Sequence, residues 1–193
     1  MKIFRFFISA FIVFSIQSSF AQTNEDNSNG FYLGITPGFA YNEIGDSRFG
    51  FKIGGIVYYN FDNNFINLSY NRLFGLNLSF NDNKNNSGNA SFERIDLGFG
   101  HSFRLHSTHP LFKHICLTAE SGISFSNISY FKDEYAEHDN SLTNLNSFGI
   151  PICLGLTSDW NNILFVGFEY KFQIIKSLKP YSELSTFLAF KVF

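Results

Sequence analysis

The chain has 193 residues, of which 45% are hydrophobic and only 16% are charged. An ordinary soluble domain carries about 25% charged residues, so this chain is poor in charge, and Phe dominates its aromatic content of 19%. Two cysteines are too few for a disulfide-rich scaffold, and a formal net charge of -2 excludes the basic surface of a nucleic-acid-binding protein. The length corresponds to one domain.

Residues 1–21 have the organisation of a secretory signal peptide: a positively charged start, an apolar run over Phe6–Ile16, and small residues ahead of the cleavage point. The apolar run is too short to cross about 30 Å of hydrocarbon as a helix, which disfavours a membrane anchor. Cleavage after Ala21 would leave 172 residues with 12 basic and 16 acidic side chains. We therefore expect an exported, mildly acidic protein with a short polar segment, 22–29, ahead of one folded domain, 30–193.

In the folded domain, apolar residues alternate with small or polar ones, which predicts β-strands, and no window sustains a helical period. Several of the alternating stretches exceed the usual strand length of about 5–6 residues. In chain order, the eight expected strands cover residues 31–41, 49–59, 66–78, 94–104, 115–126, 148–157, 164–173 and 181–193.

The connections between these strands alternate in length. Tight turns are expected at 62–64 and 160–162, with 106–113 as a longer third connection on the same side. The loops on the opposite side are expected at 42–47, 81–89, 130–146 and 175–180. A barrel inserted into a membrane from one side has short turns on that side and longer loops on the other. The longer connections are therefore expected to lie outside the cell.

The two faces of the strands differ in an unusual way. One face is aliphatic and aromatic, whereas the other is mainly Gly, Ser, Thr and Asn. A soluble sheet carries many charges on its second face, but small residues suit the interior of a narrow barrel, where a few charged residues can pair. The alternation places seven charged residues on this interior face: Lys52, Arg94, Asp96, Arg104, Glu120, Glu169 and Lys171. We expect them to fill the lumen with salt bridges, and a narrow ion path is the alternative.

The apolar face is then expected to contact lipid. Because backbone groups in hydrocarbon must all be hydrogen-bonded, the sheet has to close. Aromatic residues near strand ends would form an interfacial girdle: Tyr59, Phe61, Trp160, Tyr170 and Tyr181. Arg72 also falls on this face, where an arginine costs about 2–4 kcal/mol at the midplane and almost nothing at the rim. We expect Arg72 at the membrane rim or, alternatively, beside a bulge.

With this pattern over essentially the whole folded domain, the sequence resembles the small outer-membrane β-barrels of Gram-negative bacteria, the OmpA/OmpX-like group. The resemblance implies an all-β, eight-stranded antiparallel up-and-down transmembrane barrel in the cell outer membrane. Its expected partners are outer-membrane lipid, lipopolysaccharide and the barrel-assembly machinery, and we expect a monomer. Members typically end in an aromatic residue that this machinery reads, and Phe193 matches this assembly signal. The apolar face formed by Leu184 and Leu188 would turn Phe193 inward, which departs from the usual signal.

Few residues indicate chemistry. Cys116 and Cys153 share the interior face of adjacent expected strands, so a cross-strand disulfide and two unpaired thiols remain alternatives. Neither cysteine has a second ligand at close spacing, and we expect no metal site and no cofactor. Four histidines gather around the connection at 106–113 and are interpreted as part of a solvated turn: His101, His106, His109 and His114.

The sequence thus predicts a membrane-embedded structural or surface-interaction protein that is not an enzyme. One alternative is a secreted, soluble barrel of lipocalin type that binds an apolar ligand, although the early Gly-x-Trp of that family is missing. The other is a lipid hydrolase resembling lipid A 3-O-deacylase. It would use His101 and Ser102, or His106 and Ser107, with Glu120, but neither pair has the His-x-Ser spacing of that family.

Overall fold

The computed structural model describes residues 29–41, 49–79, 87–105, 115–131, 142–160, 163–176 and 178–192. These residues form nine β-segments: β1 (Gly30–Ile35), β2 (Gly38–Tyr41), β3 (Phe49–Phe61), β4 (Asn64–Ser79), β5 (Ser87–Arg104), β6 (Ile115–Phe131), β7 (Leu142–Trp160), β8 (Leu164–Ile175) and β9 (Tyr181–Lys191). The predicted signal peptide lies outside the described residues, as does Phe193. Within the described ranges, no helix is long and apolar enough to span a membrane.

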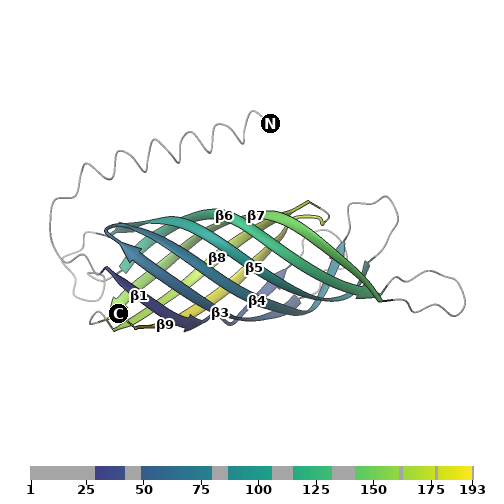
Figure 1. Cartoon of the computed structure of the whole chain (residues 1–193), viewed down its shortest axis with the longest axis horizontal. Coiled ribbons are helices and arrows are strands. Elements are labelled where there is room, and N and C mark those ends of the chain that lie inside the picture. The colour runs from purple at the N-terminus through teal and green to yellow at the C-terminus, as the bar shows by residue number, and fades with distance from the viewer. Residues whose placement is uncertain are drawn as a thin grey trace, which may run out of the picture.

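The nine segments close into an eight-stranded antiparallel barrel, because β1 and β2 occupy one strand position (Figure 1). Both pair with β3 on one side and with β9 on the other. Thr36 and Pro37 separate them, since proline has no N–H to donate to the ladder. Two backbone hydrogen bonds bridge this interruption, from Thr36 N to Gly54 O at 2.9 Å and from Thr186 N to Pro37 O at 3.0 Å. The predicted fold is confirmed.

The barrel has two unlike ends (Figure 1). β1 begins and β9 ends at the same end as the tight β3–β4 turn, and we call this the turn end. In that turn, Asp62 adopts a φ of 52°, a left-handed conformation that aspartate tolerates better than most residues. The β3–β4 and β7–β8 connections at the turn end have two and three residues, whereas the β5–β6 connection there has ten. The opposite end, where the other four connections lie, is called the loop end.

Two of the predicted loops, 81–89 and 130–146, are shorter than expected. β5 already begins at Ser87, β6 continues to Phe131, and β7 begins at Leu142. The ladder continues through polar residues here, and the Ser129 hydroxyl donates a hydrogen bond to Asn144 Oδ1 across it, at 2.7 Å. Strand segments rich in Asn and Ser are not predicted from the sequence, because these residues remove the apolar alternation while still allowing backbone pairing.

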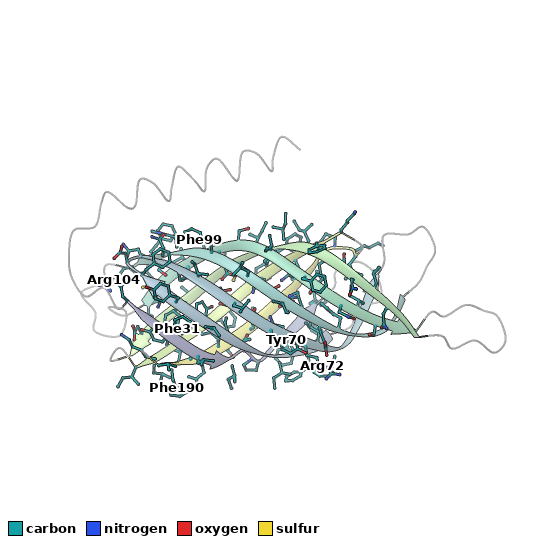
Figure 2. The ribbon with its side chains drawn as sticks, in the orientation of Figure 1. Phe31, Tyr70, Arg72, Phe99, Arg104 and Phe190 are labelled. Atoms are coloured by element: carbon teal, nitrogen blue, oxygen red, sulfur yellow. The ribbon has the colours of Figure 1, made fainter. Side chains whose placement is uncertain are left out.

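The division of the strands into two faces is confirmed. At every strand position an apolar side chain is exposed on the outside of the barrel: Leu33, Ile53, Leu68, Leu97, Ile123, Leu154, Phe168 and Leu188. Phe99 and Phe190 both project outward, from opposite sides of the barrel (Figure 2). Seven charged and three amide side chains are buried inside: Lys52, Arg94, Asp96, Glu120, Glu169, Lys171 and Glu183, with Asn67, Asn71 and Gln173. This arrangement is the reverse of a soluble barrel that encloses an apolar ligand.

Arg72 lies beside a bulge, which is one of the two alternatives considered from the sequence. It lies on the outward face, with its Nε 3.9 Å from Glu93 Oε1 and its guanidinium carbon 5.1 Å from the centre of the Phe74 ring. A bulge follows between Leu73 and Leu76, and within it Gly75 has a φ of 71°, which glycine adopts without strain. The ladder then aligns four outward polar residues across β4 to β7: Arg72, Glu93, Asn127 and Asn146. Among the described side chains of β6 and β7, this polar row ends the apolar band toward the loop end, whereas on β4 Phe74 extends it by one outward position.

Candidate functional site

The interior of the barrel is filled in three layers, with the charged residues in the middle. Near the turn end lies an aromatic cluster: Tyr32, Ile56, Tyr58, Phe65, Phe165, Phe187 and Ala189. Near the loop end lies an aliphatic cluster: Ala40, Leu73, Phe92, Ile128, Ile175, Leu178 and Tyr181. The Tyr58 ring packs 5.0 Å from that of Phe187 and 5.4 Å from that of Phe165. Leu178 enters from the β8–β9 connection and is only 1% exposed.

Arg94 of β5 organises the part of the charged layer nearer the loop end. Its Nε donates to Asp96 Oδ1 at 2.8 Å, and its Nη1 donates to the Tyr181 hydroxyl at 2.5 Å. Both Nη1 and Nη2 donate to the Glu183 carboxylate, the latter at 3.0 Å. Lys52 completes this group, with its Nζ 3.3 Å from Glu183 Oε2. Glu183 is therefore held between two cations in a fully buried setting.

Lys171 of β8 organises the part of the layer nearer the turn end. Its Nζ lies 3.4 Å from Asp96 Oδ2 and 4.0 Å from Glu120 Oε1. Asn67 Nδ2 donates to Glu120 Oε2 at 2.6 Å, and the Tyr58 hydroxyl donates to Glu169 Oε1, also at 2.6 Å. Since Asp96 contacts both Arg94 and Lys171, the two parts form one continuous network.

Six of the seven charged residues named from the sequence are brought together in this network: Lys52, Arg94, Asp96, Glu120, Glu169 and Lys171. Arg104 is not, because it is exposed at the end of β5, opposite Cys116. Sequence reasoning missed Glu183, although the apolar residues of β9 alternate in a way that turns it inward. Tyr181, expected in the outer girdle, instead points inward to Arg94.

The two cysteines are both free, and the disulfide considered from the sequence is not formed. Cys153 lies opposite Glu120 in the β6–β7 ladder, whereas Cys116 lies opposite Thr157. Four residues of β6 separate these positions, or roughly 13 Å at about 3.3 Å per residue. Cα atoms joined by a disulfide lie at most about 7 Å apart, so this register excludes the bridge.

The first hydrolase arrangement considered from the sequence, His101 and Ser102 with Glu120, is not assembled. His101 packs against Phe103, with 4.6 Å between ring centroids, and its Nδ1 lies 2.9 Å from Asn64 Oδ1. Ser102 is the next residue along the strand and points to the opposite face, where Glu120 also lies. The alternative pair, His106 and Ser107, lies outside the described residues, as do His109 and His114.

The charge balance of this layer is uneven. Among the described residues, three cations and four carboxylates are buried inside the barrel: Lys52, Arg94 and Lys171 against Asp96, Glu120, Glu169 and Glu183. Buried charges are tolerated when they are paired and hydrogen-bonded, and are costly otherwise. The pairs around Arg94 meet this condition, so the excess negative charge lies on the side of Glu120 and Glu169.

The sequence matches no protein-family model and no curated protein sequence. The fold, in contrast, is similar to solved structures. Neisserial surface protein A (NspA) has 16% sequence identity over 84% of this chain and 97% of that chain, with a TM-score of 0.61. Ail, the attachment invasion locus protein of Yersinia pestis, has 8% identity over 84% of this chain and 97% of that chain, with a TM-score of 0.52. The chain therefore has the fold of the eight-stranded outer-membrane β-barrels, as its sequence pattern predicts.

Proposed function

We propose that the protein is an integral outer-membrane barrel with a filled lumen, which acts as a structural or surface-interaction protein and not as an enzyme or an open pore. The observation that carries this proposal is a reversal of sides: relative to a soluble barrel, the apolar and the charged faces of the sheet are exchanged. Every strand position has exposed apolar side chains on the exterior, while seven charged side chains are buried in the lumen. Contact of so large an apolar exterior with water would be unfavourable, whereas lipid solvates it. The closed sheet also leaves no unpaired backbone edge in hydrocarbon.

The orientation in the membrane follows from the two unlike ends. Barrels of this kind place short turns on the periplasmic side and long loops outside. The turn end, with the start of β1 and the end of β9, is accordingly periplasmic in this proposal. The four strands that reach furthest toward the loop end, β4 to β7, have 16 to 19 residues each, more than the roughly 9–11 needed to span the membrane. Their outer ends and the loops they carry are the surface offered to the environment.

The partners expected from the sequence fit the same proposal. Outer-membrane lipid would cover the apolar band, and lipopolysaccharide would meet the polar row at its outer edge. Insertion would depend on the barrel-assembly machinery. The barrel has no free strand edge between β1 and β9 with which to recruit a second copy, which supports a monomer.

The filled lumen predicts negligible steady conductance. An ion would have to pass the aromatic cluster, the ion pairs of Arg94 with Asp96 and Glu183, and the aliphatic cluster with the buried Leu178. The measurement is single-channel recording in planar bilayers with the chain lacking residues 1–21, after folding has been checked by gel mobility, and with a large porin as the positive control. The expected result is a flat baseline. Stable, well-resolved channels would contradict the filled lumen.

A further inference from the structure

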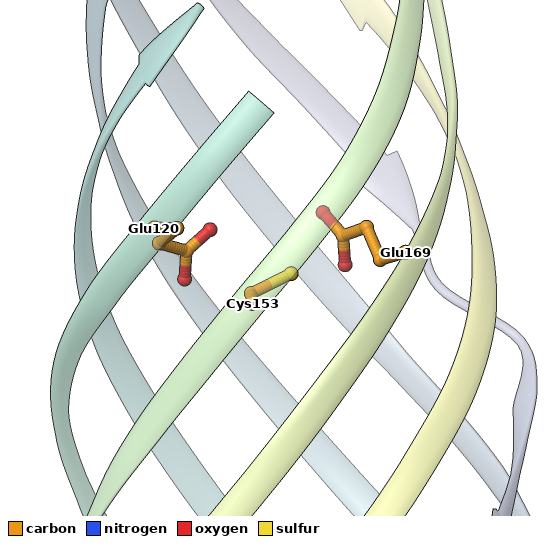
Figure 3. Close-up of side chains that lie close together, drawn as sticks. All are labelled: Glu120, Cys153 and Glu169. Carbon is orange, nitrogen blue, oxygen red and sulfur yellow. The ribbon is translucent and has the colours of Figure 1, made fainter. Parts of the chain in front are cut away.

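Three potential metal ligands converge inside the barrel from three neighbouring strands. Glu120 of β6, Cys153 of β7 and Glu169 of β8 are all buried, and one ligand atom from each lies within 4.8 Å of the other two. Their side chains reach into the same part of the lumen (Figure 3). The ladder explains the grouping: Glu120 pairs with Cys153, and Cys153 pairs with Lys171, two residues after Glu169.

Neutral donors already orient both carboxylates. Asn67 holds Glu120 through Oε2, and Tyr58 holds Glu169 through Oε1, each at 2.6 Å. Carboxylates that ligate metal ions are commonly held in this way by outer hydrogen bonds. The second oxygen of Glu120, Oε1, is buried and has no hydrogen-bond partner.

A second unpartnered oxygen lies beside it. Asn67 is 1% exposed, and its Oδ1 also has no hydrogen-bond partner. A Cβ added to Gly98 would touch both this Oδ1 and Glu120 Oε1, so the two acceptors border the same small space. The nearby cation of Lys171 does not donate a hydrogen bond to Glu120 Oε1, because its Nζ lies 3.4 Å from Asp96 Oδ2 and 4.0 Å from Glu120 Oε1. Buried acceptors without a donor are rare and costly.

The charge of the lumen indicates what is missing. Its three buried cations leave one of four carboxylates uncompensated. Binding of a divalent cation would displace the proton of the Cys153 thiol, and the layer would become formally neutral. A thiolate together with carboxylate oxygens is a donor set for a borderline ion of the zinc class and unsuited to magnesium or calcium, which take oxygen ligands.

We propose that Glu120, Cys153 and Glu169 bind one divalent transition-metal ion of the zinc class, with Asn67 positioning Glu120. The ion links β6, β7 and β8 from inside, and this role does not depend on the membrane function proposed above. The aromatic and aliphatic clusters cover the site from both ends. The ion therefore enters while the barrel folds, and the folded barrel retains it against a chelator.

Cobalt(II) is the probe, because a cobalt–thiolate bond gives a charge-transfer absorption band that carboxylates alone do not. The chain lacking residues 1–21 is refolded from urea into detergent with cobalt(II), its folding is checked by gel mobility, and excess metal is removed with a chelator. The expected result is one cobalt per chain and a thiolate band, both lost in Cys153→Ser and retained in Cys116→Ser. Glu120→Gln is expected to reduce the retained cobalt at least about 10-fold, as loss of a ligand or its support does.

The matched control also assigns the ligand. In Cys116→Ser the sole remaining thiol is Cys153, so a thiolate band in that variant identifies Cys153 even if Cys153→Ser does not fold. A folded wild-type barrel without retained cobalt or without the band overturns the proposal. So does a band that persists in folded Cys153→Ser and disappears in Cys116→Ser.

Discussion

Replacing Arg94 by Ala is expected to destabilise the folded barrel by about 3–5 kcal/mol. Arg94 donates to Asp96, Glu183 and Tyr181, and the two carboxylates are fully buried. Without the guanidinium, Asp96 and Glu183 remain as buried charges with too few partners, which costs more than the pairs themselves contribute. Urea unfolding in lipid vesicles measures the change through the fluorescence of Trp160, the single tryptophan of the chain.

Arg72→Ala is the matched control, since it removes the same side chain from the outside of the barrel. The Arg72 and Glu93 side chains are 49% and 46% exposed and 3.9 Å apart, and such exposed pairs contribute about 1 kcal/mol or less. An equal loss of stability in both variants would contradict a network in which the buried ion pairs stabilise the lumen.

Leu97→Arg is expected to cost about 2–4 kcal/mol of stability in a bilayer. Leu97 is 46% exposed on the outside of the barrel and lies on β5 halfway between the polar row at Glu93 and the turn end at His101. This position corresponds to the middle of the apolar band, where an arginine head cannot reach water without distorting the lipid. The measurement is again the unfolding free energy in vesicles.

The control for Leu97→Arg is Asn127→Arg, in the polar row that ends the apolar band, where the cost of an arginine falls to about 0–1 kcal/mol. On a water-exposed surface both changes would be nearly neutral. A difference between the two variants of less than about 1 kcal/mol would therefore show that Leu97 does not face lipid.

The division into faces could be predicted because the side-chain period of a strand is two, whatever the register. Lys52, Arg94 and Glu169 were placed inside by that rule alone. The same rule places Glu183 inside, once the outward positions of Leu184 and Leu188 define the parity of β9. Alternation failed for Arg104, because the end of a strand leaves the enclosed lumen although its parity stays inward.

Side-chain partners could not be predicted, because they depend on register. The parity of β9 turns Tyr181 inward together with Glu183, but it does not identify Arg94, 87 positions away, as the partner of Tyr181. Nor does it reveal the grouping of Glu120, Cys153 and Glu169, since each comes from a different strand and local ligand spacing is absent. Polar strand ends, such as Ser129 opposite Asn144, could not be predicted either, because backbone pairing does not require apolar alternation.

The most direct test of a membrane-embedded closed barrel is the gel mobility of the chain lacking residues 1–21, folded in detergent and run with and without boiling, together with its far-ultraviolet circular dichroism. A closed barrel predicts a faster band before boiling, a β-type spectrum, and loss of both on heating. A chain that is soluble without detergent and shows no shift in mobility would contradict it. The apolar exterior would then have to be a buried core, and the reversal of sides on which the proposed function rests would be wrong.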